Sequence, residues 1–129
     1  HENGELEGDL KIYYTTFMAS IFRSIRFGTS SAHGKANMIR FNFFKEQGVF
    51  VRSAEGKYKI NYDKMTGAMN ALSAKILKLQ GDGNYEGVAQ LVAQKTIIGD
   101  DLQADLDRLA ELGIPVDVVF EQGVGVLGL

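Results

Sequence analysis

The sequence lacks cysteine and tryptophan, and it has one proline and two histidines among its 129 residues. Without cysteine it can form no disulfides and no thiolate metal sites, and we expect a cytoplasmic protein. The net charge of −2 provides no general attraction to nucleic acid or to anionic lipid, so we expect neither as a partner. No apolar stretch reaches the ~18 residues of a membrane span, and the acidic N-terminus is unlike a signal peptide.

The composition is otherwise that of a globular protein, with 45% hydrophobic and 23% charged residues. A chain of this length suits one domain and can bury about two thirds of its surface. The first nine residues, HENGELEGD, contain four acids and two glycines, and we expect them to be irregular. Because the chain begins with His1 rather than methionine, we expect a cut or processed piece of a larger protein.

Apolar residues recur at intervals of three and four over most of the sequence, the spacing of helices with one buried face. Asp9 is a suitable N-cap for the first of these regions, and Thr29, Ser30 or Ser31 for the second. The second region is apolar nearly all round, which is typical of an inner helix. The regions that the spacing predicts as helices begin near residues 10, 30, 62, 84 and 100, and the last of them ends at Gly113.

Two regions alternate apolar and polar residues instead, which is the spacing of strands. Residues 49–60 hold two such runs around a glycine-containing loop and predict a small β-hairpin. The stretch IPVDVVFEQ, residues 114–122, predicts one strand without an obvious partner in this chain. The glycine-rich residues 123–129 predict an irregular tail.

The predicted fold is therefore mainly α, a five-helix bundle-like domain with a small β-hairpin and a C-terminal strand. We expect a single domain over residues 1–129, with a helical body at 10–113.

Most motifs of known chemistry fail in this sequence. The pair His1-Glu2 lacks the second histidine of H-E-x-x-H, so we expect no metal site within the chain. Residues 82–87, DGNYEG, resemble half of a calcium loop, but the twelfth position is Ala93 rather than glutamate. A turn followed by a helix cap explains them better. The composition permits a Ser–His–Asp triad, but no G-x-S-x-G motif supports one.

Four basic residues lie near His33 in the sequence. A solvated helix end, or pairing with acids, explains them better than RNA binding, because the net charge is negative. They are Arg23, Arg26, Lys35 and Arg40.

His33 is the strongest candidate for chemistry. With His33 in the first turn of the second helix, Asn37 and Arg40 follow at i+4 and i+7, which makes one polar stripe. The positive end of the helix dipole disfavours an imidazolium there, and a neutral imidazole can donate one hydrogen bond to an oxyanion or a substrate carbonyl. The alternative is a cap-region histidine bonded to the backbone.

The stretch AHGKANMIRFNFFKEQG, residues 32–48, resembles the segment of dipeptidyl peptidase III enzymes in which Ala-His, an apolar helix and Glu-x-Gly follow one another. The helix before it, the hairpin, and the motifs YDKM and LKLQGDG resemble the neighbouring elements of that family. The resemblance covers residues 10–122 through several ungapped anchors in the same order.

Members of this family are zinc exopeptidases that release dipeptides from the N-termini of short peptides. The resemblance implies that this chain is the C-terminal part of such an enzyme, mainly from its helical, zinc-bearing lobe. The zinc motif HExxGH and a second helix with a glutamate ligand are then expected upstream. Zinc is accordingly the expected cofactor of the full-length protein, with none in this part. The expected partners are the upstream zinc-bearing part and short peptide substrates.

In that family the histidine that matches His33 faces the cleft, holds the substrate carbonyl and stabilises the tetrahedral transition state. The resemblance thus implies a catalytic His33, and we take His33, Asn37 and Arg40 as the substrate-binding residues. Some members have arginine at the position of Asn37 and a basic pair at residues 115–117, so those roles do not carry over. Some relatives carry a Nudix hydrolase module, whose motif this chain lacks.

The sequence therefore predicts a zinc-dependent dipeptidyl peptidase that is active only as the full-length protein. Two alternatives stay open. One is a non-catalytic helical module whose apolar face covers a protein partner, and the other is a part of a Nudix-fused hydrolase.

Overall fold

The structure is a computed structural model that describes residues 8–117 and 123–128. The single domain over residues 1–129 stays a prediction. By its internal contacts the chain divides into two compact units, residues 1–98 and 99–129. These are called the first and the second unit below, and each is described by itself.

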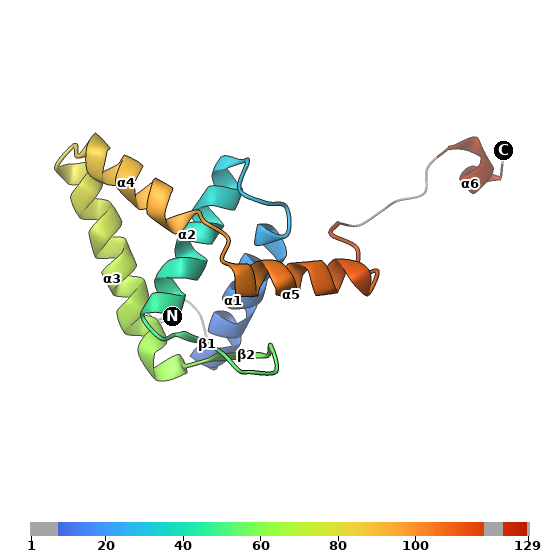
Figure 1. Cartoon of the computed structure of the whole chain (residues 1–129), viewed down its shortest axis with the longest axis horizontal. Helices are drawn as coiled ribbons and strands as arrows, with labels where there is room; N and C mark the ends of the chain where they lie inside the picture. Colours follow the sequence, from blue (N-terminus) through green and yellow to red (C-terminus); the bar gives the residue numbers. More distant parts are fainter. Residues whose placement is uncertain (1–7, 118–122, 129) are drawn as a thin grey trace. The chain divides into compact units, whose positions relative to one another are not determined.

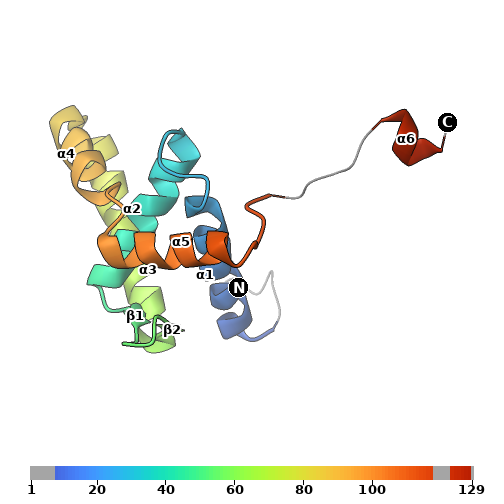
Figure 2. The same cartoon turned by 45° about the vertical axis from the view of Figure 1, so that its right-hand side comes forward.

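The described part of the first unit consists of helices around a central helix and one hairpin. The central helix α2 contacts α1, α3, α4 and β1, and Figures 1 and 2 both show it with α1 on one side and α3 on the other. The predicted inner position of this helix is therefore confirmed. The elements are α1 (Leu10–Ile25), α2 (Ala32–Glu46), β1 (Phe50–Arg52), β2 (Tyr58–Ile60), α3 (Tyr62–Gly81) and α4 (Tyr85–Lys95).

The helix ends follow local sequence signals. The Asp9 side chain accepts a hydrogen bond from the Lys11 backbone N–H at 2.9 Å, as an N-cap should. The helix α1 ends at Ile25, and Gly28 follows with a φ of +80°. A positive φ of this size favours glycine, so Gly28 permits the turn from α1 into α2.

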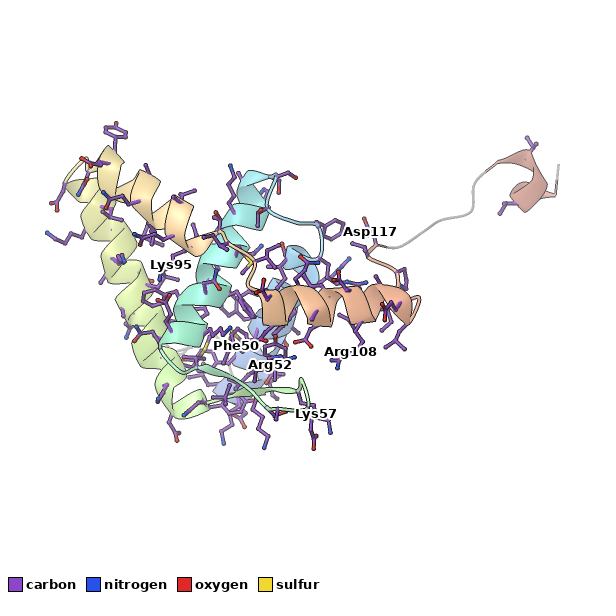
Figure 3. The ribbon with its side chains drawn as sticks, viewed as in Figure 1. Phe50, Arg52, Lys57, Lys95, Arg108 and Asp117 are labelled. Atoms are coloured by element: carbon purple, nitrogen blue, oxygen red, sulfur yellow. The ribbon has the colours of Figure 1, made fainter. Side chains whose placement is uncertain are left out.

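The core of the first unit is built from the inward faces of its helices and from one face of the hairpin. An aromatic cluster at its centre joins α1, α2 and the hairpin: the Phe41 ring centroid lies 5.3 Å from those of Phe22 and Phe50, and the Phe22 centroid lies 4.7 Å from that of Tyr58. Figure 3 labels Phe50 beside the helices. The buried apolar residues are Met18, Ile21, Ile25, Met38, Phe41, Phe43, Phe44, Val49, Phe50, Met65, Ala68, Leu72 and Leu91.

The predicted hairpin is present as two antiparallel strands with Phe50 opposite Ile60. Its alternation sets which side faces the core: Phe50 is 4% exposed and Val51 is 52% exposed. The hairpin thus contributes one aromatic side chain to the core and turns the next residue toward solvent.

The end of α4 is attached to α2 by polar contacts. The Asn42 side-chain amide donates hydrogen bonds to the Lys95 carbonyl at 3.0 Å and to the Ile97 carbonyl at 2.9 Å. Lys95 also forms an ion pair with Glu46, and Figure 3 labels Lys95 at this end of α4. These contacts satisfy carbonyls that the helix itself leaves without partners.

In the second unit the described elements are α5 (Asp100–Glu111) and the single turn α6 (Val124–Leu127). The helix α5 has Asp100 and Asp101 in its first turn and Arg108 in its last, which suits the helix dipole. The Arg108 guanidinium lies 3.4 Å from the Asp105 carboxylate.

Two predictions for the second unit need comment. The tail at 123–129 was expected to be irregular, and its residues Val124–Leu127 instead form α6, which ends at Gly128 in the left-handed conformation. Residues 114–117 of the expected strand at 114–122 have no regular structure, and the rest of that stretch lies outside the described residues. Without a partner strand, alternation of apolar residues does not suffice to form a strand. The mainly α fold with a small hairpin is otherwise confirmed.

Candidate functional site

The candidate site lies on one face of α2, from its first turn to just past its middle. His33 is the second residue of the helix, and Asn37 and Arg40 follow it on the same face, as predicted. His33 and Arg40 are exposed, and Asn37 is half-buried. Within the described part of the chain the His33 ring makes no hydrogen bond.

The first turn of α2 is held by a close backbone contact. The Ser31 side chain caps the helix by accepting a hydrogen bond from the Gly34 N–H at 3.0 Å. Gly34 is buried, and a Cβ placed on it would lie 2.1 Å from the Gly28 carbonyl oxygen. Only glycine permits this approach, which brings the loop between α1 and α2 against the residue that follows His33.

A short polar network joins α1 to the stripe on α2. The Asn37 amide donates a hydrogen bond to the Ser24 hydroxyl at 2.6 Å, and its oxygen accepts one from the Arg40 guanidinium at 2.9 Å. Asn37 therefore contacts protein groups at both ends of its amide. Its carbonyl oxygen fixes the position of Arg40.

An apolar cavity of about 200 Å³ lies beside Arg40, between α2, α3 and α4. Leu72 and Leu91 at its wall are buried, whereas Ile76 and Val88 are 37% and 39% exposed. The lining residues are Ala36, Ile39, Arg40, Leu72, Ile76, Leu79, Gln80, Val88, Leu91 and Val92.

Other motifs in the sequence have structural explanations. Residues 82–87 form the turn between α3 and α4, in which the Asn84 side chain caps α4 by accepting a hydrogen bond from the Gly87 N–H at 2.8 Å. Asp82 pairs with Lys78 at 2.9 Å. This agrees with the turn and helix cap that we favoured over a calcium loop.

The residues that the structure describes contain no group of three or more histidine, cysteine or acidic side chains placed to hold a metal ion. Among those same residues, no helix is both long enough and apolar enough to cross a membrane.

The sequence reasoning missed Ser24 and the contact between Gly28 and Gly34. Ser24 lies 13 positions before Asn37, and no local pattern links two side chains on different helices. Gly34 in the first turn of the predicted helix was the one available signal, because a glycine there can indicate that another backbone segment approaches closely.

Two solved peptidase structures are similar to this chain. Dipeptidyl-peptidase III from Corallococcus sp. strain EGB superposes with a TM-score of 0.84 at 34% identity, over 92% of this chain and 22% of that one. Dipeptidyl peptidase III from Caldithrix abyssi gives a TM-score of 0.75 at 33% identity, over 81% of this chain and 20% of that one.

A curated relative has a different name. Nudix hydrolase 3 of Arabidopsis thaliana is 36% identical over 105 residues, which are 81% of this chain and 14% of that protein. No protein-family model matches the chain. The chain spans less than a quarter of the length of each of these relatives.

By fold and by sequence identity, this chain is similar to a portion of a peptidase. The resemblance to dipeptidyl peptidase III that the sequence predicts is confirmed by both solved structures, at 33% and 34% identity. The similarity supports assignment to the C-terminal part of that family.

Proposed function

We propose that this chain is the C-terminal portion of a zinc-dependent dipeptidyl peptidase, which releases dipeptides from peptide N-termini in the cytoplasm. The observation that carries the proposal is the match to the Corallococcus enzyme over 92% of the chain at 34% identity. At this identity a shared fold over nearly the whole chain supports a shared role within a larger protein.

The zinc does not fit the described residues of this chain, which offer no ligand set. Its ligands are proposed to lie in the upstream part of the polypeptide. The partner of this chain within the protein is that upstream part, and the substrates of the whole enzyme are short peptides.

His33 is the residue of this chain that we assign to the reaction. The ring is exposed at the start of α2, so a peptide carbonyl can reach it. A ring N–H there would donate a hydrogen bond to the carbonyl oxygen and stabilise the oxyanion that forms when water attacks. Gly34 and Ser31 stabilise the first turn of α2, which contains His33.

The test uses the full-length polypeptide with His33→Ala and His33→Asn. Removal of an oxyanion donor costs roughly 10²–10³ in kcat, and we expect such a loss in dipeptide release from a chromogenic dipeptide substrate, with zinc content unchanged. Tyr85→Ala, at a side chain that is 88% exposed on α4, is the matched control and should retain full turnover. Unchanged turnover in both His33 variants would remove His33 from the mechanism.

The two alternatives make different predictions for the same protein. A non-catalytic interaction module would release no dipeptide from any peptide at any zinc concentration. A part of a Nudix-fused hydrolase is suggested by the name of the Arabidopsis relative, but this chain covers 14% of that protein and lacks the Nudix motif. We infer that the name describes another part of that relative.

A further inference from the structure

We propose that Arg40 and the adjacent cavity bind the C-terminal residue of the peptide substrate, with the guanidinium on its carboxylate and the cavity around its apolar side chain. This inference rests on the proposed function, because it takes the scissile carbonyl to lie at His33. It assigns to Asn37 the part of a positioning residue rather than a substrate ligand.

The guanidinium is oriented for this task. Asn37 accepts a hydrogen bond from one of its nitrogen atoms, and Asn37 is itself anchored on Ser24 of α1. A guanidinium has five N–H donors in a planar fork that matches a carboxylate. One bond to Asn37 therefore leaves enough N–H donors for a bidentate contact with a carboxylate. Among the residues that the structure describes, no carboxylate forms an ion pair with Arg40.

The cavity beside Arg40 selects the side chain. Its wall is almost wholly aliphatic, with Gln80 as the second polar residue besides Arg40. An apolar cavity of about 150 Å³ admits a benzene ring, so the roughly 200 Å³ present here admits one aliphatic or aromatic side chain. A cationic side chain would lose its hydration there and would lie beside the Arg40 guanidinium.

The spacing along α2 fixes the length of peptide that reaches both groups. Arg40 lies seven residues after His33, which is about 10.5 Å along the helix axis. An extended peptide covers about 3.3–3.6 Å per residue, so about three residues separate the scissile carbonyl from the carboxylate. With the dipeptide on the other side of the scissile bond, the preferred substrate is about five residues long and ends in an apolar residue.

The experiment compares pentapeptides that end in leucine as the free acid or as the amide, using the full-length zinc-loaded polypeptide. We expect kcat/KM to be roughly tenfold or more higher for the acid, the size of a hydrogen bond to a charged group. In Arg40→Ala the acid and amide should differ by no more than about twofold. Arg40→Lys should give an intermediate ratio, because an ammonium lacks the planar fork.

Two further variants sharpen the result. Asn37→Ala should raise KM for the acid more than it lowers kcat, since it releases Arg40 without touching the reacting atoms. Lys75→Ala removes one positive charge from an exposed position on α3 and should keep the wild-type acid-to-amide ratio.

The possible failures are distinguishable. If no peptide of any length releases a dipeptide, the proposed function is wrong and this inference falls with it. If dipeptides are released but acid and amide react equally, or if Arg40→Ala keeps the preference for the acid, the proposed function stands and Arg40 is not the carboxylate ligand.

Discussion

The two halves of α2 are held in place by different interactions. In the C-terminal half, Phe41 and Phe44 are each 1% exposed and pack against aromatic rings of α1 and the hairpin. In the N-terminal half, the cap of Ser31, the backbone contact of Gly34 and the bond from Asn37 to Ser24 keep the helix against α1 and its loop. Apolar burial dominates the C-terminal half, whereas in the N-terminal half specific contacts add to the burial of Met38.

This difference indicates which property a substitution in each half of α2 should affect. Loss of buried apolar area lowers the free energy of unfolding of the whole unit. Loss of one close contact mainly changes the conformation of the turn that contains it. Substitutions in the C-terminal half should therefore reduce stability, and substitutions in the N-terminal half should act first on the position of His33.

The largest effect on stability is expected from Phe41→Ala. The variant removes a ring that contacts Phe22 and Phe50, and such truncations cost about 3–5 kcal/mol of unfolding free energy. Urea denaturation of the chain monitored by circular dichroism measures the loss. Phe27→Ala is the control, because that ring is 52% exposed and its removal should change stability by less than about 0.5 kcal/mol. Equal losses in the two variants would contradict the central place of the aromatic cluster.

A smaller effect is expected from Gly34→Ala. The new methyl group would meet the Gly28 carbonyl, so the loop must move, at a cost of about 1–3 kcal/mol. Gly67→Ala is the matched control on α3, where nothing lies within 4 Å of the added Cβ, and it should raise stability by up to about 1 kcal/mol. Thermal unfolding compares the two, and the NMR signals of the His33 ring should move in Gly34→Ala alone. A Gly34→Ala protein as stable as Gly67→Ala would refute the close contact.

The smallest of these effects is expected from Ser31→Ala, which removes the side-chain cap of α2 and should cost about 1 kcal/mol. Asn61 provides the comparison, since it occupies the N-cap position of α3 without a side-chain cap bond. Asn61→Ala should cost clearly less in the same denaturation experiment. If both variants lose the same stability, the hydrogen bond from Gly34 to Ser31 contributes nothing to the first turn.

The sequence predicted the elements of the first unit well, because their signals are local. Asp9 as a cap, the spacing of apolar residues in α3 and the alternation at Phe50 each depend on neighbours a few positions away. The single turn α6 was missed, since its four residues are too few to show a helical period.

The candidate site was predictable only in part. The common face of His33, Asn37 and Arg40 follows from helical geometry alone. The anchoring of Asn37 on Ser24 and the approach of Gly28 to Gly34 depend on how α1 and its loop pack, which no pattern in one helix records. The cavity required α2, α3 and α4 together.

The two hydrogen bonds of the Asn42 amide bear on how this polypeptide can be shortened. They end on the carbonyls of Lys95 and Ile97, so the natural border of the first unit lies beyond the last turn of α4. A truncation after Ile98 keeps both acceptors, whereas one placed at the end of α4 deletes the acceptor at Ile97 and cuts beside the other. A truncated protein that consists of the first unit alone should therefore retain the three residues that follow Lys95.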